Sequence, residues 1–131
     1  MNKHPARVFT AIAGALLLLQ GASTLLFRLN PSLDRAFPAL LAVTQMIPIH
    51  SALHVATGVV ALFIFYRGGE RGALWFTLGF SIFYLTLGLA GLLSGQPMGL
   101  GLQPFDHPVH IMFGVLGFFA AYLTSSRKVS V

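Results

Sequence analysis

The sequence predicts an all-α integral membrane protein, a four-helix bundle built from two helical hairpins that repeat in parallel. Hydrophobic residues make up 56% of the 131 residues and charged residues only 8%, far below the roughly 25% of charged residues in soluble domains. Four apolar runs each have about the length of a helix that crosses a bilayer. Two of these runs also begin with related motifs, so we treat residues 1–131 as one four-span domain with an internal repeat.

The composition excludes several classes of function. The net charge is +5, but the eight Lys and Arg residues stand singly or in pairs between apolar runs, and they form no basic face for nucleic acid. The chain has no cysteine, which excludes disulfides and thiolate metal sites. A metal site would therefore use nitrogen and oxygen ligands.

The first predicted span covers residues 8–27 and follows a short basic segment. A cleavable signal peptide is the alternative, because small residues occur at Gly21, Ala22 and Ser23. The apolar run continues beyond them to Phe27, which favours a retained helix. For residues 38–46 we expect either a short helix in the membrane interface, with Pro38 in its first turn, or a plain loop.

The other predicted spans cover residues 49–66, 73–93 and 106–123. The connection between the second and third spans is short and polar, whereas residues 94–105 form a longer loop rich in Gly and Pro. Six positive residues fall on the side of the short connection and the chain ends, namely Lys3, Arg7, Arg67, Arg71, Arg127 and Lys128. The other side carries Arg28 and Arg35. The positive-inside rule then predicts a multi-pass protein of the inner (cytoplasmic) membrane with both termini in the cytoplasm.

This topology makes the second and fourth spans parallel, with the hairpins related by an axis along the membrane normal. A weaker similarity between residues 18–26 and 85–93 supports the pairing, with Gly21 matching Gly88. Small residues allow membrane helices to approach closely. We therefore expect the second and fourth spans to contact each other through faces that carry Gly58 and Gly114.

The two related motifs are the only cluster of chemical groups in the spans. The segment 48–63 matches the segment 104–119 at a separation of 56 residues. His50 aligns with Asp106, His54 with His110, and Gly58 with Gly114. Since residues four apart lie on one face of a helix, each motif presents a polar group, an imidazole and a glycine at successive turns.

If the two faces meet, His50, His54, Asp106 and His110 form a site for one zinc or copper ion. Haem b is a less favoured cofactor, with His54 and His110 as axial ligands and Arg28 or Arg35 near the propionates. One alternative is structural: Asp106 caps its helix, and the histidines form hydrogen bonds between helices. Another is that the histidines handle a proton or a substrate. His107 is expected to be exposed, and His4 has no evident partner.

On these motifs the chain resembles the small bacterial four-helix membrane proteins of domain-of-unknown-function family 4383. The resemblance covers most of the chain and is carried by His50-Ser-Ala-Leu-His54 followed by Gly58, and by Asp106-His-Pro-Val-His110 followed by Gly114. His107 and Pro108 depart from the usual pattern of the family. The resemblance implies a four-span membrane protein and no established activity.

Two functions follow as hypotheses. One is a membrane protein with a metal or cofactor site near the outer face. The other is a non-catalytic accessory subunit of a larger membrane complex, or a homo-oligomer, because a four-helix chain has little interior of its own. Catalysis by the protein alone is not expected, since one carboxylate and no cysteine lie in the spans.

Overall fold

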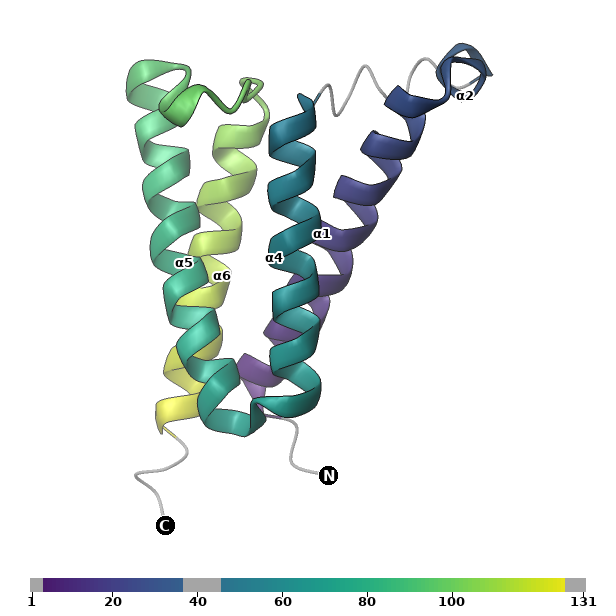
Figure 1. Ribbon diagram of the computed structural model, residues 1–131. Helices are drawn as coiled ribbons and strands as arrows, with labels where there is room; N and C mark the ends of the chain where they lie inside the picture. The colour runs from purple at the N-terminus through teal and green to yellow at the C-terminus, as the bar shows by residue number, and fades with distance from the viewer. Residues whose placement is uncertain (1–3, 37–45, 127–131) are drawn as a thin grey trace.

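The computed structural model describes residues 4–36 and 46–126, apart from the side chain of Asp34. Four long helices dominate it, α1 (Pro5–Leu29), α4 (Pro48–Arg67), α5 (Gly69–Ser94) and α6 (Asp106–Ser126), and each is long and apolar enough to cross a membrane. Two short helices, α2 (Pro31–Ala36) and the 3-10 helix η1 (Pro97–Gly99), lie in the connections (Figure 1). The described residues contain no strand, so the predicted all-α four-helix fold is confirmed.

Each predicted span lies inside one long helix, and the helices extend beyond the predictions by up to four residues at their ends. Polar and basic residues such as Arg67 and Glu70 continue the helical backbone past the apolar run, because they are good helix formers. The predicted interfacial helix falls mainly on residues 37–45, which lie outside the described residues. Met46, at its end, is buried just before α4 begins.

The bundle has two different ends. At one end α4 and α5 are joined by a tight turn in which Gly69 adopts a positive φ of 59°, a conformation that glycine reaches without steric strain. The start of α1 and the end of α6 lie at this same end (Figure 1), where the Ala6 amide donates a 2.9 Å hydrogen bond to the Thr124 hydroxyl. We call it the turn end. The opposite end, which carries the α5–α6 connection, is the loop end.

The helices pack most closely within two hairpins, α1 with α4 and α5 with α6. Glycines set the distances between the paired helices. A Cβ atom on Gly58 would lie 2.7 Å from the backbone nitrogen of Leu18 in α1, and one on Gly114 would lie 2.8 Å from the backbone nitrogen of Leu85 in α5. The prediction that the second and fourth spans contact each other through these glycines is therefore wrong, because each glycine face is filled by its hairpin partner.

The two hairpins meet at α1 and α5 near the turn end. The hydroxyl oxygens of Thr10 and Thr77 are 3.2 Å apart, and both hydroxyls also lie within hydrogen-bonding distance of the Ala6 carbonyl, at 2.8 Å and 3.3 Å. All three residues are fully buried. Away from this contact α1 leans outward toward the loop end (Figure 1).

The apolar core is small, as expected for a bundle with a lipid-facing exterior. Ala13, Leu17, Phe80 and Tyr84 form its centre, and the rings of Phe80 and Tyr84 stack with centroids 4.0 Å apart. Large apolar side chains instead cover the outside, and Leu93 is 90% exposed. In a bilayer these side chains contact the apolar hydrocarbon region and are removed from water.

Candidate metal centre

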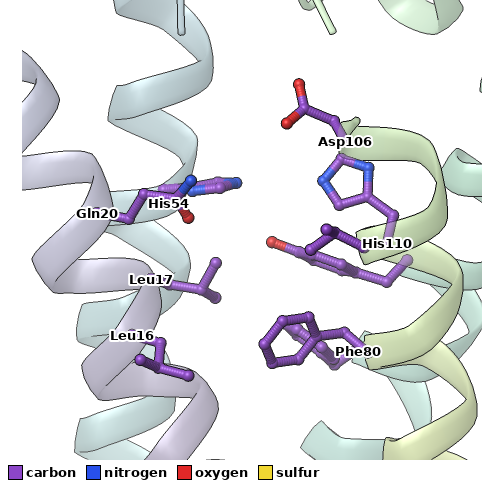
Figure 2. A pocket seen from close by; sticks show the side chains of 10 residues that line it. Leu16, Leu17, Gln20, His54, Phe80, Asp106 and His110 are labelled. Atoms are coloured by element: carbon purple, nitrogen blue, oxygen red, sulfur yellow. The ribbon is translucent and has the colours of Figure 1, made fainter. Parts of the chain in front are cut away.

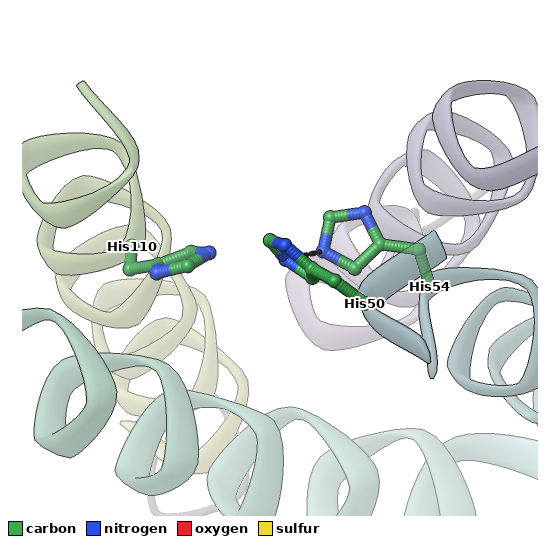
Figure 3. A group of neighbouring side chains, drawn as sticks. All are labelled: His50, His54 and His110. Atoms are coloured by element: carbon green, nitrogen blue, oxygen red, sulfur yellow. Dashed lines mark hydrogen bonds between the residues drawn. The ribbon is translucent and has the colours of Figure 1, made fainter. Parts of the chain in front are cut away.

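Three histidines meet between the hairpins in the half of the bundle nearer the loop end. His50 and His54 lie one turn apart on α4, and His110 comes from α6. Their exposed fractions are 2%, 6% and 4%, so all three imidazoles are removed from solvent. One ring nitrogen from each histidine lies within 4.8 Å of the other two. The His50 ring lies between the rings of His54 and His110 (Figure 3).

Few hydrogen bonds satisfy these rings. The Nε2 atoms of His50 and His54 are 3.1 Å apart and share one hydrogen bond. The Nδ1 atoms of all three rings are buried and have no hydrogen-bond partner among the described residues. A buried polar group without a partner costs about 1–3 kcal/mol, so the cluster is unfavourable unless water or another ligand completes it.

The spacing suits one ion. Two nitrogens bound tetrahedrally to zinc at about 2.0–2.1 Å lie roughly 3.3–3.4 Å from each other. The 3.1 Å between His50 and His54 is close to that value, and the 4.8 Å limit for the whole group requires only a small movement of the imidazole of His110. Neutral imidazole is a suitable ligand for zinc, copper and other first-row metals.

Asp106, the fourth residue predicted for the site, lies outside this group of three nitrogens. Its Oδ2 accepts a 2.7 Å hydrogen bond from the backbone N–H of Gln103. The backbone N–H of Asp106 donates a 2.9 Å hydrogen bond to the backbone carbonyl of Gln103. These two bonds fix the start of α6, where a negative charge is also favoured by the helix dipole. The carboxylate still borders a cavity with His54 and His110 (Figure 2).

Two cavities flank the imidazoles. The α1–α6 cavity, of about 40 Å³, is lined by Leu16, Leu17, Gln20, His54, Phe80, Tyr84, Asp106, Val109, His110 and Phe113. The α4–α5 cavity, of about 70 Å³, is lined by His50, Leu53, His54, Thr57, Phe83, Tyr84, Leu87 and Leu100. A single buried water needs roughly 10–15 Å³, so each cavity has room for water or a small ligand beside the histidines.

Tyr84 is a site residue that the sequence analysis missed. Its ring meets the His110 ring edge to face, with centroids 5.0 Å apart, and it borders both cavities. Gln20 of α1, which the sequence analysis also missed, lies beside His54 and lines the same cavity (Figure 2). The position of Gln20 along the helix could have identified it as a site residue, because it lies one turn from Leu17 on the buried face of α1.

Two expectations about the other histidines are wrong. His107 is buried, with 6% exposed, because its ring packs directly on the backbone of Gly91 in α5. Only glycine leaves space for an imidazole there. His4 does have a partner, since its Nε2 contacts a carboxylate oxygen of Glu70 near the start of α5.

Comparisons with known proteins add no assignment. No family model matches the chain, and neither the curated proteins nor the solved structures include a match. The resemblance to domain-of-unknown-function family 4383 stays a prediction.

Proposed function

We propose that this membrane protein binds one first-row transition-metal ion, zinc or copper, through His50, His54 and His110. The observation that supports the proposal is the convergence of three buried imidazoles from two hairpins, with ring nitrogens within 4.8 Å and with their Nδ1 atoms unpaired among the described residues. An ion would bind one lone-pair nitrogen of each ring, in place of the single hydrogen bond that His50 and His54 share.

The structural alternative explains less of this arrangement. It requires the histidines to link helices by hydrogen bonds, but the bond between His50 and His54 joins two residues of α4. The contact of His50 with His110 is between rings whose centroids are 6.2 Å apart. Ionisable residues in spans are usually functional when no structural pairing accounts for them.

A metal ion also fits better than haem. A porphyrin held between His54 and His110 would need the space that the His50 ring occupies (Figure 3). Arg28, predicted to meet a propionate, donates a 2.6 Å hydrogen bond from Nε to the Met46 carbonyl and so fastens the end of α1 to the segment before α4. Purified protein is expected to show no Soret band.

The proposed orientation places the metal site toward the outer face of the inner membrane. It rests on the excess of Lys and Arg at the turn end and the chain termini, which the positive-inside rule assigns to the cytoplasm. Reporter fusions in the turn at 67–72 and in the loop at 94–105 test it. The turn is expected to report a cytoplasmic location and the loop an external one, and any other pair of locations would contradict the orientation.

The metal proposal is tested by elemental analysis of the full-length protein purified without a polyhistidine tag. The wild type is expected to contain about one zinc or copper ion per chain. His110→Ala and His54→Ala are each expected to lose stoichiometric metal, because two remaining imidazoles hold an ion much less tightly. His107→Ala is the matched control, since it removes a buried imidazole three residues from His110 that faces α5.

The outcomes separate the two functions. Metal in the wild type and in His107→Ala, together with its loss in His110→Ala at unchanged helicity, supports the metal site. Equal, substoichiometric metal in all variants would contradict it. A stoichiometric protein partner in the same preparation would then favour the accessory subunit of a larger membrane complex.

A further inference from the structure

The polar groups around the histidines are not evenly distributed between the two cavities. The α1–α6 cavity is lined by His54 and His110, which come from different hairpins, and also by the Asp106 carboxylate and Gln20. The α4–α5 cavity adds Thr57 to two histidines of the same helix. A ligand bound between the hairpins can therefore find both a metal ion and a carboxylate only in the α1–α6 cavity.

The two cavities occupy corresponding places. A shift of 56 residues from α4 to α6 takes Leu53 to Val109 and Thr57 to Phe113. The first residue of each pair lines the α4–α5 cavity, and the second lines the α1–α6 cavity. Tyr84 borders both. Because the cavities match in position, a bulky side chain at Val109 or at Leu53 blocks one of them and leaves the other unchanged.

Three imidazoles do not complete the coordination of zinc or copper. Sites with three protein ligands keep a fourth position for water or a substrate. The Oδ2 atom of Asp106 is engaged by the Gln103 amide at 2.7 Å, so the start of α6 holds this carboxylate as a neighbour of the site. The remaining acceptor capacity of the carboxylate suits a hydrogen bond from a metal-bound molecule.

We propose that the metal ion keeps an exchangeable fourth position that opens into the α1–α6 cavity, where Asp106 accepts a hydrogen bond from the bound molecule. The inference rests on the proposed function. It gives the class of ligand: a small molecule that coordinates through a lone pair and donates a hydrogen bond, such as water or a primary amine. An anion that lacks a proton is disfavoured, because the carboxylate repels it.

The test uses full-length protein loaded with cobalt(II), whose visible absorption reports coordination, and azide as the probe. Cobalt stoichiometry is measured first. The wild type is expected to change its spectrum as azide is added, which shows an exchangeable position. Asp106→Asn is expected to keep its cobalt and to bind azide roughly tenfold more tightly, since a negative charge beside the site is removed.

Matched variants assign the position to a cavity. Val109→Phe is expected to weaken azide binding at least tenfold, while Leu53→Phe leaves it within twofold of the wild type. Leu16→Phe narrows the α1–α6 cavity from α1 and replaces Val109→Phe if that variant does not fold. Leu16 is 47% exposed, so a larger side chain is tolerated there.

Three results would overturn the inference. If saturating azide changes the spectrum of neither the cobalt-loaded wild type nor cobalt-loaded Asp106→Asn, the site has no exchangeable position. Loss of cobalt in Asp106→Asn would make Asp106 the fourth ligand, as the sequence alone predicts. Loss of azide binding in Leu53→Phe in place of Val109→Phe would assign the position to the other cavity. Failure of the wild type to bind cobalt at all would instead overturn the proposed function itself.

Discussion

The α1–α4 hairpin and the α5–α6 hairpin share their packing contacts and differ in the side chains between them. Cβ atoms on Gly21 and Gly88, 67 residues apart, would each lie 2.9 Å from a backbone nitrogen of the partner helix, that of Val55 or of Ile111. Gly58 and Gly114 behave in the same way toward α1 and α5. The close approach of helices is thus achieved twice with the same small residues.

The difference lies on the surfaces that the hairpins turn toward each other. Where α1 has Leu17, α5 has Tyr84, and where α4 has His50, α6 has Asp106. A symmetric pair of hairpins would place identical groups around the centre. Here the unequal pairs put a phenol and a carboxylate beside the imidazoles, which shows that packing and chemistry are set by different residues of the same helices.

The largest expected effect comes from the shared contacts. Gly58→Ala and Gly114→Ala are each expected to lower the free energy of unfolding in detergent by about 1–3 kcal/mol, because the added Cβ meets backbone atoms of the neighbouring helix. Backbone cannot move aside as a flexible side chain can. Thermal unfolding followed by circular dichroism measures the change.

Gly79→Ala is the control for these two variants. Among the described residues, no atom beyond the local helix backbone lies within 4 Å of a Cβ at Gly79. The better helix propensity of alanine is therefore expected to raise stability by up to about 1 kcal/mol. Comparable losses at Gly58 and Gly114 would support equivalent packing. A loss at only one of them would show that the hairpins are held together differently.

The fold could be predicted from the sequence because each span is a long apolar run with polar ends. Hydropathy identifies a span without any knowledge of which helices pack beside it. Residues 73–93, for example, were predicted as a span and all lie within α5. The burial of His54 and His110 also follows from register, since both lie on a face with glycine one turn further along. These are properties of single helices, which a sequence displays directly.

Contacts between helices could not be predicted in the same way. The glycine faces of α4 and α6 looked alike, and similarity was interpreted as mutual contact, whereas Gly58 and Gly114 each pack inside their own hairpin. His107 looked exposed because it stands one residue beyond Asp106 at the start of α6. Its burial depends on Gly91, 16 residues away in another helix, and nothing local to His107 indicates that pairing.

This pairing provides a second way to test the comparison. At the positions that correspond to Gly91 and His107, the first hairpin has Thr24 and Ser51, both buried. The single variant Gly91→Thr is expected to destabilise the protein, because its side chain overlaps the imidazole ring. Adding His107→Ser recreates the pair of the first hairpin and is expected to recover part of that loss.

A double-mutant cycle measures this recovery. The expected coupling between Gly91→Thr and His107→Ser is about 0.5–3 kcal/mol in the favourable direction, the range found for residues in contact. Strictly additive effects on the free energy of unfolding would show that a small residue in one helix does not compensate for a large one in the other.

The smallest expected effect concerns the contact that joins the hairpins at the turn end. Thr10 and Thr77 are 67 residues apart and lie with their hydroxyl oxygens at 3.2 Å. Thr10→Val and Thr77→Val keep the shape of the side chain and are each expected to lower the free energy of unfolding by about 0.6 kcal/mol, the average for hydrogen bonds between membrane helices. The double variant is expected to lose less than the sum, because both substitutions remove the same bond. Thr86→Val, at an exposed position of α5, is the control and is expected to change little. Additive losses in the double variant would mean that each hydroxyl acts only through its bonds to backbone carbonyls, such as the bond from Thr77 in α5 to the Ala6 carbonyl in α1, and that the contact between the two hydroxyls contributes nothing.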